Sequence, residues 1–173
     1  MKFSKFSISL AILSLITFCN QCCLAYKDGE FPGKGSVQAW HQAAVFLRDG
    51  HILQDNGKYD EAIAKFKAAI AIYPYEPAAW GRLGNCYQDK KEYALAESAH
   101  RKATALNPDD WMGWSDLSRT FYFEDKIPDY KAAMVKALSC HPPSKEAAEI
   151  QGSIKDIAKY LSEQKDSAAK KTK

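Results

Sequence analysis

Residues 77–108 read PAAWGRLGNCYQDKKEYALAESAHRKATALNP. Seven residues in this stretch have counterparts of similar kind 34 residues earlier and 34 residues later. The seven residues are Trp80, Leu83, Gly84, Tyr87, Ala96, Ala103 and Pro108. The upstream counterparts are Phe46, Asp49, Gly50, Leu53, Ala62, Ala69 and Pro74, and the downstream ones are Trp114, Leu117, Ser118, Phe121, Tyr130, Ala137 and Pro142. Because the spacing holds without an insertion, the sequence predicts a repeat protein.

The recurring residues suit a pair of packed helices in each period. Trp80, Leu83 and Tyr87 stand at i, i+3 and i+7, which places three large apolar groups on one face of a helix. Small residues such as Gly84 and Ala96 allow a second helix to come close. A proline then ends the second helix, because the residue before it is forced out of the helical region. Each period is therefore predicted to be a helical hairpin.

The turns within the hairpins differ in composition. Asn56 and Gly57 supply the first turn, since glycine accepts the backbone conformations that tight turns require. Residues 125–128 supply the third turn, and Pro128 suits the first turn of the following helix. This third turn lacks the usual glycine, so the sequence fixes its geometry least.

The pattern resembles the tetratricopeptide repeat (TPR), a unit of about 34 residues with Trp-x2-Leu-Gly-x2-Tyr in its first helix and Ala-x3-Phe in its second. The resemblance covers residues 43–142. It implies an all-α fold, a right-handed superhelical solenoid of helical hairpins whose concave face binds other proteins. Three repeats are expected, at residues 36–76 with an N-terminal helix extension, at 77–110 and at 111–143.

The N-terminal residues are typical of a secretory signal peptide, predicted to span residues 1–25. Lys2 and Lys5 precede an apolar run over residues 6–19, which small residues follow. This pattern predicts export, to a periplasm or to the exterior. The alternative is an uncleaved membrane anchor, but 14 helical residues rise only about 21 Å, against about 30 Å of hydrocarbon. Residues 26–35 contain several glycines and are expected to form a flexible leader.

The C-terminal part is predicted to cap the solenoid and then to become disordered. Residues 144–161 carry apolar groups at steps of three and four, at Ala147, Ile150, Ile154, Ile157 and Leu161. A solenoid needs such a terminal helix with a polar outer face for solubility. Residues 162–173 have no apolar stripe and are expected to form a disordered, lysine-rich tail.

Charge and motifs disfavour several classes of function. The chain has a net charge of +3, and subtracting the two lysines of residues 1–25, a stretch without acidic residues, leaves +1. Basic residues alternate with acidic ones, so nucleic acid is not an expected partner. The sequence contains no glycine-rich phosphate loop, nucleophile elbow or metal-spaced group of ligands. No catalytic residue, metal, cofactor or small-molecule substrate is therefore predicted.

The resemblance places the binding surface on repeat positions 2, 5, 9, 12 and 13 of each first helix. Nine residues are the predicted partner-binding groove: Trp40, Leu47, His51, Asn85, Gln88, Met112, Arg119, Tyr122 and Phe123. His51, Asn85 and Arg119 occupy the same repeat position and form a polar ladder that could hydrogen-bond the backbone of an extended segment. The alternative is that these residues have no ligand, and that Tyr122 and Phe123 only pack at a helix end.

One TPR specialisation, the carboxylate clamp for the C-terminal tails of heat-shock chaperones, has a different set of side chains. The clamp needs Lys and Asn in the first repeat, Asn in the second, and Lys and Arg in the third. The corresponding residues here are Leu47, His51, Arg82, Met112 and Asp116. A cytosolic co-chaperone role is therefore disfavoured.

The sequence thus predicts an exported, non-catalytic adaptor or assembly factor that binds a protein or peptide segment in its concave groove. Two alternatives stay open. The first is a structural module that self-associates weakly through an edge of the solenoid. The second is an accessory subunit of a membrane complex, held by an uncleaved N-terminal helix.

Overall fold

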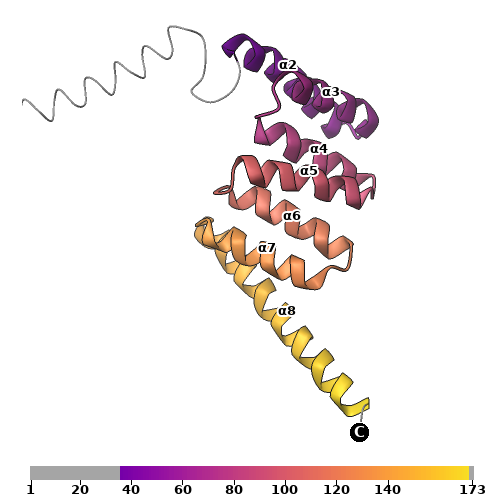
Figure 1. Ribbon diagram of the computed structural model, residues 1–173, viewed down its shortest axis with the longest axis vertical. Coiled ribbons are helices and arrows are strands. Elements are labelled where there is room, and N and C mark those ends of the chain that lie inside the picture. Colours follow the sequence, from indigo (N-terminus) through magenta and orange to yellow (C-terminus); the bar gives the residue numbers. More distant parts are fainter. Residues whose placement is uncertain (1–35, 172–173) are drawn as a thin grey trace, which may run out of the picture.

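The computed structural model describes residues 36–171, with side chains up to residue 164, and over this range the chain forms seven α-helices (Figure 1). They are α2 (Val37–Asp55), α3 (Tyr59–Ile72), α4 (Pro77–Asp89), α5 (Tyr93–Leu106), α6 (Trp111–Phe123), α7 (Ile127–Ser139) and α8 (Ser144–Lys171). The predicted all-α fold is confirmed. The predicted signal peptide and leader, residues 1–35, lie outside the described residues.

The helices pack as three successive hairpins and a final single helix. The hairpins are α2–α3, α4–α5 and α6–α7, and the first helix of each hairpin packs on the second helix of the hairpin before it. The helices α2, α4 and α6 also touch in succession, whereas α3, α5 and α7 do not contact one another among the described helices. The stack therefore curves, with the first helices on its concave side.

Within each of the first two hairpins the closest approach lies between a glycine and a ring. A Cβ atom added to Gly50 would come within 2.6 Å of the Phe66 ring, and one added to Gly84 would come within 2.6 Å of the His100 ring. Both rings are fully buried. The two pairs are one repeat apart, so the same geometry serves a phenylalanine in the first hairpin and a histidine in the second.

Indole groups tie consecutive hairpins together. The Nε1 of Trp80 donates a hydrogen bond to the carbonyl of Pro74 at 2.8 Å, and the Nε1 of Trp114 donates to the carbonyl of Pro108 at 2.9 Å. Each bond joins the first helix of a hairpin to the chain segment that enters it. The tryptophan therefore both packs in the core and fixes the angle at which its hairpin begins.

The three turns inside the hairpins share one backbone conformation. Gly57, Lys91 and Asp125 occupy the same place in successive repeats, and they have φ angles of 72°, 61° and 57°. The third turn therefore has the same geometry as the first, although it lacks the glycine. In each turn the backbone amides that follow the helix donate to its last carbonyls, for example from Lys126 to Phe121 at 2.9 Å. These hydrogen bonds hold a left-handed conformation that only glycine adopts without cost.

The substitution Lys91→Gly should accordingly raise the free energy of unfolding by about 0.5–1 kcal/mol, because it removes the steric cost of the positive φ. Lys91 is exposed, and it forms no ion pair among the described residues. Urea denaturation of the variant and of Lys102→Gly measures the effect. The control variant places glycine inside α5 and should lose about 1 kcal/mol, so equal effects of the two substitutions would contradict the argument.

The C-terminal helix is longer than the sequence suggested. The expected disorder from residue 162 onward is wrong up to Lys171, because α8 continues to that residue and projects beyond the stacked hairpins (Figure 1). Residues 162–171 lack an apolar stripe, but they also lack glycine and proline and are rich in the helix formers Ala, Glu, Gln and Lys. Packing on the last hairpin therefore explains the first part of α8, and helix propensity alone explains its continuation through residues 162–171.

The first half of α8 covers the last hairpin, as a capping helix should. Ile150 is buried against Met134 and Ala137 of α7, and Trp111 of α6 packs on the same cluster. Among the described helices, none is long and apolar enough to cross a membrane.

Candidate functional site

The middle of the concave face is a hydrogen-bonded network centred on Arg119 of α6. Its Nε donates to Oε1 of Gln88 at 2.8 Å, and its Nη2 donates to Oδ1 of Asn85 at 3.2 Å and to Oδ1 of Asp116 at 2.8 Å. Gln88 in turn donates to the hydroxyl of Thr120 at 2.9 Å. The structure thus brings together three predicted groove residues, and it joins them to one another across α4 and α6.

This network leaves one side of the guanidinium available. A guanidinium has five N–H groups, and the three contacts use the one on Nε and both on Nη2. The two N–H groups of Nη1 have no partner within the part of the chain that the structure describes, and the Arg119 side chain is 52% exposed. Asn85, Gln88 and Asp116 therefore hold a guanidinium that still has two N–H donors for another acceptor.

The carboxylate of Asp116 anchors the guanidinium to α6. Burial raises the pKa of Asp116, and the positive charge of Arg119 and a hydrogen bond from Asn85 oppose that shift. Both opposing contacts favour the ionised carboxylate, because a positive charge and a donated hydrogen bond stabilise it. Its charge balances that of Arg119, so the centre of the groove carries a directed donor with little net charge.

His51 of α2 lies in the same repeat position but is not part of this network. Burial lowers its pKa, the charge of Arg82 lowers it further, and Asp55 opposes both. The imidazole is therefore neutral at pH 7 and can both donate and accept one hydrogen bond. The described side chains show no hydrogen bond from His51 to Asn85 or Arg119. The predicted ladder is thus continuous between the second and third repeats only.

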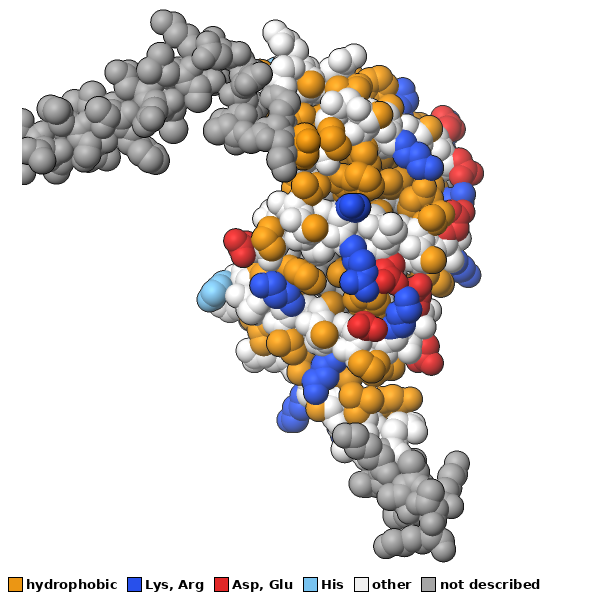
Figure 2. Space-filling model, viewed as in Figure 1, with side chains coloured by type: hydrophobic (Ala, Val, Ile, Leu, Met, Phe, Trp, Pro, Cys, Tyr) orange, Lys and Arg blue, Asp and Glu red, His pale blue; other side chains and the backbone are white. Residues whose placement is uncertain are grey.

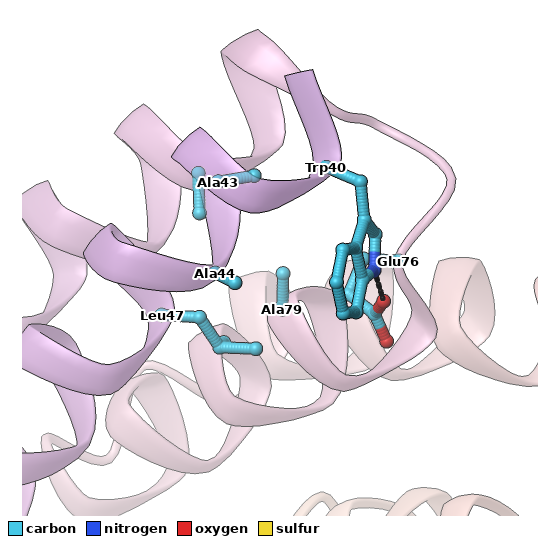
Figure 3. A pocket seen from close by; sticks show the side chains of 7 residues that line it. Trp40, Ala43, Ala44, Leu47, Glu76 and Ala79 are labelled. Carbon is cyan, nitrogen blue, oxygen red and sulfur yellow. Dashed lines mark hydrogen bonds between the residues drawn. The ribbon is translucent and has the colours of Figure 1, made fainter. Parts of the chain in front are cut away.

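The first end of the groove is a small apolar hollow between α2 and α4. Figure 3 shows the Trp40 indole on one side of Ala79, with Ala43, Ala44 and Leu47 on the other side. The Nε1 of Trp40 donates to Oε2 of Glu76 at 3.2 Å, and Oε1 of the same carboxylate accepts from the backbone amide of Ala78, which caps α4. The predicted residues Trp40 and Leu47 therefore line one hollow.

The third repeat presents its predicted residues in different directions. Met112, Tyr122 and Phe123 are all about half exposed. The Phe123 ring stacks on Tyr93 of α5 at 5.2 Å between centroids, and Tyr122 makes an edge contact with Tyr130 of α7 at 5.6 Å. Phe123 thus packs at the helix end, the alternative that the sequence left open, while Tyr122 faces the junction with α7 and α8.

Sequence reasoning missed the groups that position the predicted residues. Asp116 and Thr120 complete the Arg119 network, and Glu76 holds Trp40, but none of the three is large, apolar or part of the repeat pattern. Only Asp116 carries a positional signal, because it lies three residues before Arg119 and so shares its face of α6.

Charged side chains of both signs lie on the face of the described residues that Figure 2 draws. On the face in Figure 2, basic and acidic side chains are interspersed, and hydrophobic side chains lie between them. Among the described residues no group of three or more His, Cys, Asp or Glu side chains could hold a metal ion.

Known proteins resemble this chain in the repeated region. A family model described as tetratricopeptide repeat matches residues 53–117. The first TPR domain of human RPAP3 is 27% identical and superposes with a TM-score of 0.64, over 73% of this chain and 98% of that one. The TPR domain of Sgt2 from Aspergillus fumigatus is 17% identical, with a TM-score of 0.64 over 72% of this chain and 82% of its own. The chain has the TPR fold.

Two similar structures contain a bound peptide. The first TPR of Spaghetti (RPAP3), 26% identical to this chain with a TM-score of 0.65 over 71% of it and 95% of that chain, is bound to the HSP90 peptide SRMEEVD. The secretion chaperone SycD of Yersinia enterocolitica is in complex with a peptide of the translocator YopD; it is 14% identical, with a TM-score of 0.63 over 72% of this chain and 95% of that one. A search of curated protein sequences finds no match.

Proposed function

We propose that this protein is an exported, non-catalytic adaptor that binds an extended segment of another protein in its concave groove. The observation that carries the proposal is the Arg119 guanidinium, which Asn85, Gln88 and Asp116 hold and whose two Nη1 N–H groups have no partner among the described residues. The peptide complexes of the similar proteins support a groove that binds protein segments. Partner recognition is then the sole biochemical task of the protein.

The chemistry of the groove defines the segment that it suits. The two N–H groups of Nη1 point in different directions, so they suit two separate acceptors of a segment, for example one carboxylate oxygen and one backbone carbonyl. Leu47 and Met112 offer apolar contact on either side of the polar centre, and His51 can accept or donate at neutral pH. A segment with an acceptor between two apolar side chains therefore matches this surface best.

The substitution Arg119→Lys tests the central donor. Lysine keeps the charge beside Asp116 but loses the fork that holds Nη1 in place, so binding should weaken by about 1–2 kcal/mol, or roughly fivefold to thirtyfold. The ligands are peptides selected from a displayed random twelve-residue library on the wild-type protein. Calorimetry then measures the dissociation constant of each selected peptide for the wild type and the variant.

The matched control is Lys102→Ala, which removes a cation from α5, outside the concave row. The control should bind every peptide as tightly as the wild type. Peptides that bind Arg119→Lys with unchanged affinity would remove Arg119 from the site. If the protein selects no peptide at all, the adaptor function is wrong.

The location of the protein is a separate part of the proposal. Export rests on the signal-like pattern of residues 1–25 in the sequence. N-terminal sequencing of the protein recovered from its native host tests it, since cleavage after residue 25 would leave Tyr26 at the terminus. A protein that retains Met1 and fractionates with membranes would instead favour the anchored alternative.

A further inference from the structure

The last helix does more than cover the third hairpin, because it also continues the groove. Ser153, Asp156 and Ile157 of α8 lie one repeat period after Arg119, Tyr122 and Phe123 of α6. The helix thus takes the place of a fourth first helix, although the large residues of the repeat pattern are absent from it. Like α4 and α6, it packs on the second helix of the preceding hairpin.

Unlike those helices, α8 stands away from its predecessor on the concave side. Its backbone contacts α7 but not α6, whereas α4 and α6 each contact the first helix before them. A hollow therefore opens between α6, α7 and α8. Its walls include Tyr122, Tyr130, Ile157, Tyr160, Asp125 and Asp156.

The aromatic part of this hollow is accessible. Tyr122 is 58% exposed and Tyr160 is 49% exposed, and the rings of Tyr122 and Tyr130 meet at 60°. Tyr122 and Tyr160 therefore leave part of each ring open to a ligand, and the face of a tyrosine ring is electron-rich. Such faces attract cations, and a guanidinium can stack on them.

The charged part of the hollow is negative and unpaired. Asp125 lies at the turn before α7 and Asp156 on α8, and neither forms an ion pair with the side chains that the structure describes, residues 36–164. No lysine or arginine lines the hollow. Two carboxylates beside three tyrosines are therefore without a positive partner within the described chain.

We propose that this tyrosine–aspartate hollow binds an arginine side chain of the partner segment. The proposal rests on the proposed function, because the segment passes Arg119 one helical turn earlier on α6. The guanidinium stacks on the tyrosine rings and donates to Asp125 and Asp156. The groove then binds a hydrogen-bond acceptor of the segment at Arg119 and a cation of the segment at the hollow. These two contacts fix the direction in which the segment lies.

The experiment uses N-acetyl-arginine amide as a probe and its neutral isostere N-acetyl-citrulline amide as the matched control ligand. Amide chemical shifts of the full mature protein are recorded by NMR during each titration. The arginine compound should cause saturable shifts at residues 122, 125, 156 and 160, with weak, roughly millimolar affinity. The citrulline compound should cause none there, and equal responses to the two compounds would overturn the proposal.

The protein variants give the second arm of the test. Asp125→Asn with Asp156→Asn should raise the dissociation constant of the arginine compound at least fivefold, whereas Asp109→Asn, an exposed turn residue, should not change it. Asparagine also tolerates the positive φ of residue 125, so the turn is kept. An unchanged constant in the double variant would overturn the proposal.

The two proposals fail in distinguishable ways. Suppose that displayed peptides bind the wild type more tightly than Arg119→Lys, but that the arginine compound causes no shifts at the hollow. The hollow then has no cation site, and the adaptor function stands. If the hollow binds the compound while no peptide is selected, the adaptor function is wrong. Dimerisation that the double aspartate variant abolishes, without any response to the arginine compound, assigns the hollow to a second copy and overturns the proposal.

Discussion

The substitution Phe66→Ala should lower the free energy of unfolding by about 3–5 kcal/mol, the range expected when a fully buried aromatic ring is removed. Phe66 has no exposed surface, and its ring fills the space over Gly50 between α2 and α3. The backbone at Gly50 cannot move inward to fill the cavity without breaking the hairpin. With three hairpins to share the loss, the first repeat should unfold at much lower urea concentration.

Urea denaturation followed by circular dichroism measures this effect, and Val45→Ala is the control. Val45 lies on the same hairpin but is 47% exposed, so its truncation should cost less than about 1 kcal/mol. Comparable losses in the two variants would show that the Gly50–Phe66 contact is not the centre of the hairpin.

A second large effect is expected from pH, through His100. This residue occupies the place of Phe66 in the second hairpin, it is fully buried, and neither ring nitrogen has a hydrogen-bond partner among the described residues. Burial lowers the pKa of His100 to about 4, and the charge of Arg119 adds to the shift. The unfolded chain therefore takes up the proton first, near pH 6.5, and the folded chain only near pH 4.

The stability of the wild-type protein should fall as the pH is lowered from about 6.5 to 4, by about 3 kcal/mol at the lower limit from this residue. The substitution His100→Phe should remove this dependence and should raise stability at pH 7 by about 1–2 kcal/mol, because an unpaired polar ring no longer lies in the core. Gly84 leaves the same space over the ring that Gly50 leaves over Phe66.

Denaturation at pH 7, 6, 5 and 4 for the wild type, His100→Phe and His41→Gln separates this residue from other titrating groups. His41 is exposed, so its variant should keep the acid sensitivity of the wild type. The explanation fails if His100→Phe loses stability with falling pH as steeply as the wild type does.

The repeat period predicted the fold because it fixes which residues meet. A small residue on the first helix must pack against a large ring on the second, and the Gly50–Phe66 and Gly84–His100 pairs do so. The period could not show that the ring packed on Gly84 would be a histidine without a hydrogen-bond partner among the described residues. The burial of His100 depends on three-dimensional packing, so its residue type alone did not mark it as a core residue.

The candidate site was predictable to a smaller extent. The repeat register placed Asn85, Gln88 and Arg119 in adjacent rows, but side-chain rotamers decide that they bond to one another. Likewise, the sequence located α8 from its apolar stripe, whereas its separation from α6 depends on how it leans on α7. The hollow beside Tyr122 follows from that separation, so no pattern along the chain could reveal it.

The indole bonds from Trp80 to Pro74 and from Trp114 to Pro108 set the joints between hairpins. One period after Trp114 the chain has Ala148, so α8 enters without such a bond. Each of the first two joints between hairpins therefore contains a directional hydrogen bond, which favours one angle between the hairpins. The joint between α7 and α8 rests on apolar contact, which permits α8 to slide on α7. The width of the groove at that end can therefore adjust to a bound segment without loss of a hydrogen bond.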